Sequence, residues 1–92
     1  MKKIDWNLVG FVRRSKNRVK ALEILKEPFT PAEIGREMKI SLTHGSKIIR
    51  ELASKKLVAC LNDELKVGRI YQITELGRDV LKESKGIKYL KY

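Results

Sequence analysis

Two helix-start signals near the middle of the chain, with a very short gap between the helices they open, restrict the fold more than any other feature. The stretch Thr30-Pro31-Ala32-Glu33 supplies an N-cap threonine, a proline at the first helical position and a glutamate that closes a capping box. This helix runs to about Met38, and Ser41 is the expected N-cap of the next helix, Leu42 to about Lys55. A gap of three or four residues is typical of a helix-turn-helix pair, whose helices cross steeply.

The helix that begins at Leu42 has an apolar face and a polar face. Its apolar stripe, expected to pack on the preceding helix, consists of Gly45, Ile48, Ile49 and Leu52. Its polar face consists of Thr43, His44, Ser46, Lys47 and Arg50. Gly35 and Gly45 are small where two crossing backbones approach closely, which is a reason to tolerate the cost of about 1 kcal/mol for glycine inside a helix.

The polar face carries the groups that read DNA in the major groove. Lys47 and Arg50 can donate hydrogen bonds to guanine O6 and N7 or to phosphates, and Thr43 offers a methyl group to thymine. We predict a recognition helix in the major groove, with DNA contacts from Ser41, Leu42, Thr43, His44, Ser46, Lys47 and Arg50. The alternative is a solvated helix face on which His44 is an idle surface residue.

Helical and strand periodicity place the remaining elements around this pair. Helices are predicted over 5–14 and 15–27, and the sequence leaves open whether they are continuous. Two β-favouring runs, Leu57–Leu61 and Arg69–Ile73, predict a hairpin with a longer loop, and Thr74 caps a last helix. In the first helix Ile4, Leu8, Phe11 and Val12 fall on one side, and Trp6 and Val9 widen this apolar face. The inward residues of the second and last helices are expected to be Val19, Leu22, Leu25, Leu76, Val80 and Leu81. The predicted fold class is mainly α with a small β-hairpin (α+β), a winged helix-turn-helix with a three-helix core, a wing, and N- and C-terminal helices.

Basic side chains in the hairpin loop and near the second helix extend the predicted DNA contact. Lys66 and Arg69 flank the loop tip, from which a wing reaches the minor groove or phosphates. Asp63 and Glu64 lie in the same loop and oppose this, so a wing that serves only packing is an alternative. Additional phosphate contacts are predicted for Arg14, Lys16 and Arg18.

The charge balance indicates a polyanionic partner. Lys and Arg number 21 against 11 acidic residues, a formal net charge of +10. Neutralising phosphates releases condensed counterions, so double-stranded DNA is the predicted partner. An evenly solvated surface and an anionic membrane surface are the alternatives.

Several classes of protein are disfavoured by what the sequence lacks. With one cysteine, Cys60, and one histidine, His44, we expect no disulfide framework, no metal site and no cofactor. There is no nucleophile–base pair, no carboxylate cluster and no glycine-rich phosphate loop, so we expect no enzyme. No apolar run approaches the roughly 20 residues that span a bilayer. We read no signal peptide, so no membrane partner and a cytoplasmic location are expected.

The two ends of the chain are rich in apolar residues. A chain of 92 residues is expected to form one domain, 1–92, with a thin core. We therefore expect a homodimer through the helix 1–14 and the tail 86–92, with contacts from Trp6, Leu8, Phe11, Val12, Leu81 and Tyr89. A two-fold dimer sets two recognition helices about one DNA turn apart. Alternatively, the first helix folds back on its own core.

Over about residues 14–85 the chain resembles archaeal and bacterial winged-helix regulators of the MarR/ArsR type. The segments that carry the resemblance are Arg14–Arg18, Thr30–Ile34, Ile40–Leu52, Lys56–Val58 and Tyr71–Gly77, the last similar to a "Y-x-L-T-x-x-G" pattern. The resemblance implies a three-helix core with a wing and a role in transcriptional control. Lys39 stands where such proteins often have glycine, which implies a left-handed residue in the turn. The cysteine ligands of metal-sensing ArsR members are missing, so metal sensing is unsupported.

The sequence is compatible with three functions, of which a sequence-specific transcription regulator is the preferred one. The others are a non-specific architectural DNA-binding protein and a winged-helix protein-interaction module of a transcription or RNA-processing complex.

Overall fold

The computed structural model describes residues 4–86 and contains the predicted elements in the predicted order. It is mostly helical with one antiparallel hairpin, which confirms the predicted fold class. The elements are α1 (Trp6–Arg13), α2 (Lys16–Ile24), α3 (Pro31–Met38), α4 (Leu42–Ser54), β1 (Val58–Cys60), β2 (Tyr71–Ile73) and α5 (Glu75–Gly86).

α1 and α2 are separate helices, because each has its own N-cap. The Asp5 carboxylate accepts a hydrogen bond from the amide of Asn7 at 3.0 Å and opens α1. Ser15 is extended, and its Oγ accepts from the amide of Arg18 at 3.3 Å to open α2. A serine in extended conformation cannot continue the preceding helix, so the chain turns here.

The central helix pair has the predicted caps and turn. Thr30 Oγ1 accepts from the amide of Glu33 at 3.2 Å, and the Glu33 carboxylate accepts from the amide of Thr30 at 2.8 Å, which confirms the capping box. Ser41 Oγ accepts from the amide of His44 at 3.0 Å and opens α4. Between the helices, Lys39 adopts the left-handed conformation with φ 59° and ψ 42°. A side chain in that region costs about 1–2 kcal/mol, which the surrounding helix packing must offset.

The hairpin is shorter than predicted and is attached to the helix pair. Val58 lies opposite Ile73 in the antiparallel pair. On its other edge, Tyr71 exchanges two backbone hydrogen bonds with Phe29, at 3.1 and 2.9 Å. Since Phe29 directly precedes the N-cap of α3, this bridge fixes the base of the hairpin beside the helix-turn-helix.

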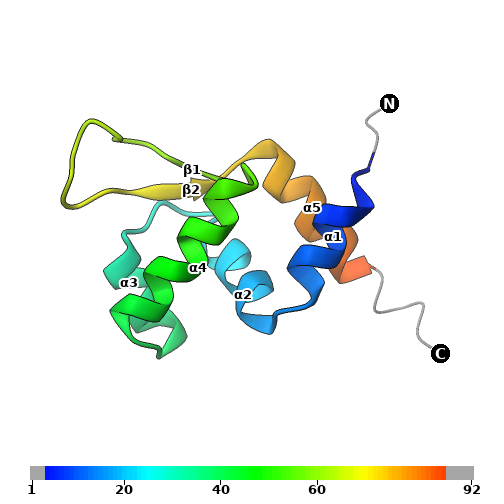
Figure 1. Cartoon of the computed structure of the whole chain (residues 1–92), viewed down its shortest axis with the longest axis horizontal. Coiled ribbons are helices and arrows are strands. Elements are labelled where there is room, and N and C mark those ends of the chain that lie inside the picture. Colours follow the sequence, from blue (N-terminus) through cyan, green and yellow to red (C-terminus); the bar gives the residue numbers. More distant parts are fainter. Residues whose placement is uncertain (1–3, 87–92) are drawn as a thin grey trace.

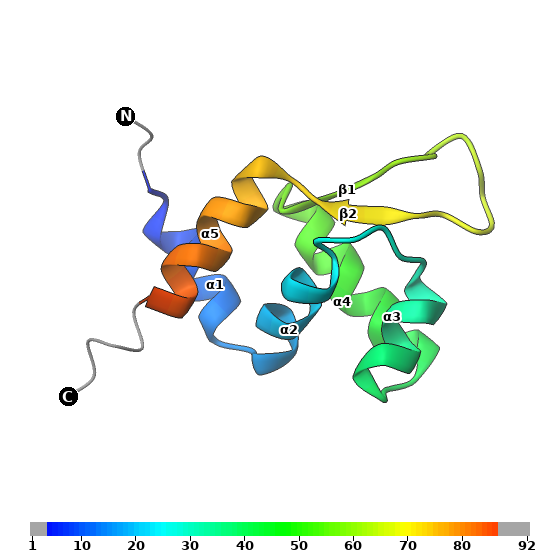
Figure 2. The same cartoon turned by 180° about the vertical axis from the view of Figure 1, so that it is seen from behind.

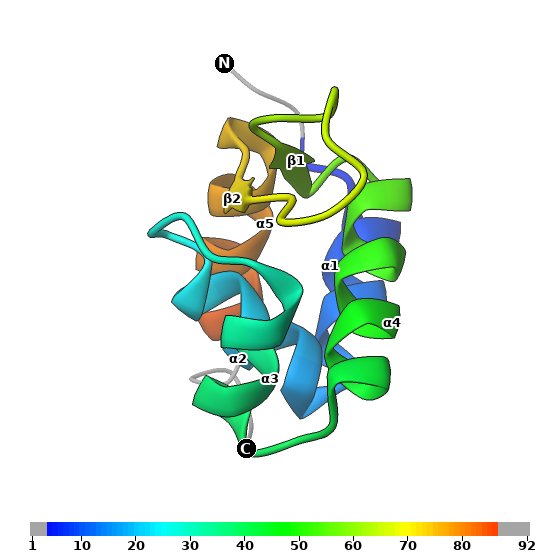
Figure 3. The same cartoon turned by 90° about the vertical axis from the view of Figure 1, so that its left-hand side faces the viewer.

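The helices gather at two ends of an elongated molecule (Figure 1). α1 and α5 pack together at one end, α3 and α4 at the other, and α2 lies between them. The hairpin projects from the body at the α3–α4 end, as the view from behind also shows (Figure 2). Seen from that end, α4 runs along one edge of the molecule with the hairpin at its top (Figure 3). The predicted recognition helix, α4, and the predicted wing therefore share one end of the fold (Figure 1).

The core contains side chains from every helix and both strands. Its largest fully buried side chains are Leu22, Leu25, Ile34, Ile49, Leu52, Leu57, Val9 and Val12. Leu76, expected to face inward, is 40% exposed. The cause is its neighbour Gly77, which packs so tightly that a Cβ atom there would lie 2.1 Å from the carbonyl oxygen of Leu57. Successive helical residues point about 100° apart, so Leu76 is turned toward solvent.

The residues expected at a dimer contact mostly belong to this core instead. Val12 and Leu81 are 0% and 2% exposed, and Leu8 and Phe11 pack against the core as partly buried residues. The first helix thus folds back on its own domain, the alternative considered above, because α1 packs on α5 and α2. Tyr89 and the rest of the tail 87–92 lie outside the described residues. Among the described members of the set, Trp6 alone is largely exposed, at 59%.

Candidate nucleic-acid interface

The two faces of α4 are separated as the sequence predicts. Gly45, Ile48, Ile49 and Leu52 are buried against the domain. The side chains on the opposite face are exposed, apart from the partly buried Ser46, and they are Leu42, Thr43, His44, Lys47 and Arg50. Within residues 4–86, neither Lys47 nor Arg50 forms an ion pair. Both cations are therefore available to an external partner.

A surface groove of about 580 Å³ lies between α4 and the hairpin loop. From the helix pair it is lined by Thr30, Pro31, Ala32, Leu42, Ser46, Ile49 and Arg50, and from the hairpin by Lys66, Val67, Gly68, Arg69 and Tyr71. The predicted wing residues and three predicted recognition-helix residues, Leu42, Ser46 and Arg50, are thus brought together around one groove. The lining combines polar and cationic side chains with apolar ones such as Ala32, Ile49 and Val67.

The hairpin loop has a hydrogen-bonded structure of its own, centred on Asn62. The Asn62 side-chain oxygen accepts from the amide of Ile70 at 2.8 Å, and its amide nitrogen donates to the carbonyl of Gly68 at 3.2 Å. Sequence reasoning missed this role, although an asparagine directly after a strand is a common turn signal. Gly68 has φ +76°, a left-handed conformation that favours glycine.

Arg69 is turned into the loop. Its Nε donates to the carbonyl of Leu65, and its Nη2 donates to the carbonyl of Asp63 at 3.2 Å. The side chain predicted to reach DNA thus stabilises the loop that presents its neighbours. Lys66 is exposed at the tip.

The other predicted phosphate contacts divide into two groups. Arg14 and Lys16 are exposed at the turn between α1 and α2. Arg18 is occupied within the domain, with Nη1 donating to the carbonyl of Phe11 at 2.6 Å and Nε donating to the Glu51 carboxylate at 3.3 Å. Its guanidinium also lies 3.8 Å from the centroid of the Phe11 ring. These contacts tie α1, α2 and α4 together, and they remove Arg18 from the set of free cations.

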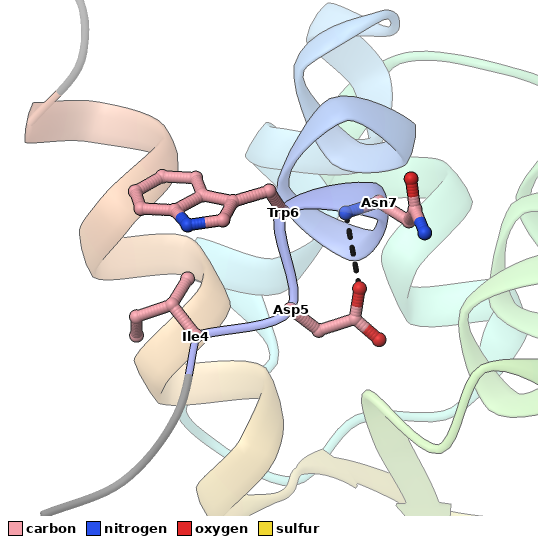
Figure 4. A pocket seen from close by; sticks show the side chains of 4 residues that line it. All are labelled: Ile4, Asp5, Trp6 and Asn7. Atoms are coloured by element: carbon pink, nitrogen blue, oxygen red, sulfur yellow. Dashed lines mark hydrogen bonds between the residues drawn. The ribbon is translucent and has the colours of Figure 1, made fainter.

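The start of α1 forms a second surface feature (Figure 4), at the end of the molecule where α1 packs on α5. Ile4, Asp5, Trp6 and Asn7 line a shallow hollow of about 430 Å³. Trp6, the first residue of α1, and Ile4, just before the helix, project toward the same side in this view, whereas the Asp5 carboxylate is held by the helix cap. This places an apolar surface at the end of the molecule opposite the groove.

Metal-binding and membrane-spanning features were searched for in residues 4–86. No group of three or more His, Cys, Asp or Glu side chains there could hold a metal ion. Nor does any helix in that part of the chain combine the length and apolarity needed to cross a bilayer. The charged side chains that line the groove are all cations: Arg50, Lys66 and Arg69.

Comparison with known proteins finds similarity in structure. No protein-family model matches the sequence, and no curated protein matches it either. Escherichia coli MarR complexed with operator DNA aligns with a TM-score of 0.70 and 20% identity over 87% of this chain and 62% of that chain. Lactococcus lactis ZitR in complex with DNA aligns with a TM-score of 0.64 and 25% identity over 78% of this chain and 51% of that chain.

Adhesin competence repressor AdcR from Streptococcus pyogenes aligns with a TM-score of 0.65 and 18% identity over 88% of this chain and 65% of that chain. A zinc-dependent MarR family regulator AdcR, in its Zn(II)-bound state, aligns at 0.59 with 22% identity over 76% of this chain and 49% of that chain. The chain therefore spans between about half and two thirds of the length of these structural neighbours. It has the winged helix-turn-helix fold of MarR-family transcriptional regulators.

Proposed function

We propose that this chain binds double-stranded DNA in a sequence-specific manner and acts as a transcription regulator, with α4 in the major groove. The observation that carries the proposal is the exposed face of α4, where Lys47 and Arg50 have no partner among the described residues while the opposite face is buried. Such a helix can enter the groove without unpacking the domain. MarR and ZitR, which share the fold, were solved with DNA bound.

The proposed contacts follow from position on the domain. Base edges are read by Thr43, Ser46, Lys47 and Arg50, with His44 beside them, and Ser41 and Leu42 lie at the end of the helix that enters the groove. Phosphates on either side are met by Arg14, Lys16 and Lys66. The net charge of +10 supplies the long-range attraction.

We further propose that the protein acts as a homodimer that joins copies through the α1–α5 end. Trp6 is exposed there beside Ile4, and Leu76 lies exposed at the start of α5. Burying a tryptophan removes 150–250 Å² or so of largely apolar surface from water. Two α4 helices related by a two-fold axis would fit a palindromic site.

The remaining parts of the proposal concern chemistry and location. The chain acts by binding and not by catalysis, needs no cofactor or metal for binding, and works as one domain in the cytoplasm. Because the structural neighbour AdcR is zinc-dependent, the expectation that DNA binding needs no metal should be tested directly. Binding in the presence of a chelator tests it, since affinity should not change.

The test of the function is selection of bound sequences from a random duplex library, followed by footprinting. A sequence-specific regulator should enrich one motif whose affinity exceeds that for random duplexes by about 10³-fold or more. Enrichment of two inverted half-sites about 10 base pairs apart supports the dimer.

A second candidate is non-specific architectural binding, favoured by the high positive charge. It predicts tight binding to every duplex with no enriched motif. No binding to any duplex at low salt would instead favour the protein-interaction module and overturn the proposal.

A further inference from the structure

The hairpin loop presents apolar side chains to solvent, from its base at Leu61 to its tip at Val67. Leu61, Leu65 and Val67 are all exposed, and Val67 is the extreme case at 86%. It stands between the exposed Lys66 and the left-handed Gly68. Exposing an apolar side chain to water is unfavourable, so covering Val67 with a partner would contribute favourable free energy to binding.

The exposure of Val67 is a property of an organised loop. Asn62 holds Gly68 and Ile70, and Arg69 holds the carbonyls of Leu65 and Asp63. The amide of Leu61 also donates to the carbonyl of Ile70 at 2.7 Å, one step beyond the paired strands. With its flanks hydrogen-bonded in this way, the tip is held away from the core.

The inward turn of Arg69 changes what the wing offers to DNA. Its Nε and Nη2 are both engaged by loop carbonyls. The exposed side chains near the tip are therefore the acidic Asp63 and Glu64, the apolar Leu65 and Val67, and the cation Lys66. Of these, Lys66 and Val67 line the groove beside α4.

The tip also lies beside the face of α4 that we propose to read DNA. Lys66 and Val67 line the groove whose other wall includes Leu42 and Arg50 of α4. When a helix occupies the major groove, a wing beside it meets the adjoining phosphates and minor groove. The walls of the minor groove are deoxyribose C–H surfaces, which suit an apolar side chain, while Lys66 suits the phosphates.

We propose that Val67 is an apolar wedge that enters the minor groove beside the half-site read by α4, with Lys66 holding the flanking phosphate. This deepens the proposed DNA-binding function and rests on it. Apolar wedges partly unstack a base step and open it toward the major groove. The wedge should therefore favour flexible pyrimidine–purine steps, such as TpA, over stiff ApA at the flank of the site.

The test uses the full chain and its selected site, with 2-aminopurine placed at the flanking step as a fluorescent reporter of unstacking. The wild type at saturation should raise the fluorescence and should prefer TpA over ApA flanks. Val67→Ala removes two methyl groups and should cost about tenfold in affinity on the TpA site. It should also abolish both the fluorescence rise and the flank preference.

Two further variants separate the wedge from general effects. Val67→Thr keeps the branched shape but exchanges a methyl group for a hydroxyl, and it should behave nearly as Val67→Ala. Lys47→Ala should weaken binding yet leave the fluorescence rise intact once the site is saturated. Circular dichroism checks that each variant folds.

The outcomes distinguish the wedge from the function on which it rests. Sequence-selective binding with unchanged affinity, flank preference and fluorescence in Val67→Ala overturns the wedge alone. The same result with altered sedimentation assigns the tip to a protein contact and also overturns it. Failure of the wild type to bind any duplex overturns the proposed function together with the wedge.

Discussion

Gly45 of α4 and Gly35 of α3 face each other at the point where the two helices cross. A Cβ atom added to Gly45 would lie 3.4 Å from the Cα of Gly35 and 3.3 Å from the carbonyl oxygen of Pro31. A Cβ atom on Gly35 would lie 3.2 Å from the carbonyl oxygen of Ile40, in the turn. Backbone meets backbone here, and this contact sets how α4 projects from the domain.

Gly45→Val should therefore destabilise the domain. The branched side chain would force the helices apart at a contact that is already tight, at an overpacking cost of about 1–3 kcal/mol. Gly10→Ala is the matched control, since nothing lies within 4 Å of a Cβ at Gly10. It should stabilise by up to about 1 kcal/mol through helix propensity alone. Guanidinium unfolding measures both, and an unchanged midpoint for Gly45→Val would show that the crossing is not set by this contact.

Lys47→Ala and Arg50→Ala should weaken DNA binding without unfolding the domain, because both side chains project from the exposed face of α4. Loss of a guanine contact should cost about 1–3 kcal/mol and relax the preference at one base pair. Lys82→Ala is the control, as it removes one exposed cation from α5, the helix that packs on α1. Fluorescence anisotropy on the selected site and on random duplexes makes the comparison. Equal losses of DNA affinity for all three variants would mean that only the net charge matters and not the position on α4.

DNA binding should fall steeply as salt is added. Each phosphate neutralised by a lysine or arginine contributes a slope of about −0.9 to the plot of log affinity against log salt concentration. Lys66→Ala should lower the magnitude of the slope by about one unit if Lys66 meets a phosphate. A flat titration would contradict a phosphate interface.

Arg18→Ala should lower the free energy of unfolding by about 1.5–3 kcal/mol, the range for hydrogen bonds that involve a charged group. The reason is that Arg18 joins the carbonyl of Phe11, the carboxylate of Glu51 and the face of the Phe11 ring. A double-mutant cycle with Glu51→Gln separates the Arg18–Glu51 term. Full additivity would mean that the ion pair contributes nothing and that the Phe11 contacts account for the loss.

Trp6→Ala should shift the protein from dimer toward monomer while the domain stays folded, because Trp6 is exposed on α1. Phe11→Ala is unsuitable as a second test, since Phe11 supports Arg18. Leu76→Ala, at the start of α5, is the second variant for testing the dimer, because Leu76 is exposed. Sedimentation equilibrium at micromolar concentration provides the measurement. A wild type that is monomeric off DNA and binds as one copy per footprint would refute the dimer.

The helices, their caps and their turn were readable in the sequence because each depends on residues close together in the chain. The capping box of Thr30 and Glu33 and the cap at Ser41 join residues three apart. The buried and exposed faces of α4 follow from the helical period for the same reason. Local chemistry of this kind is present before any tertiary contact forms.

Whether each side chain is free to contact DNA or a second copy depends on contacts between residues far apart in the chain. Arg18 looks like any surface cation in the sequence, yet it is held by Glu51, a residue 33 positions away. Val12 and Leu81 lie far apart in the chain, yet both belong to the core of one domain instead of to a dimer contact. A helix presents a side chain by its period, but whether that side chain meets solvent depends on which element packs there. Only the tertiary structure settles that, because packing sums interactions over the whole chain.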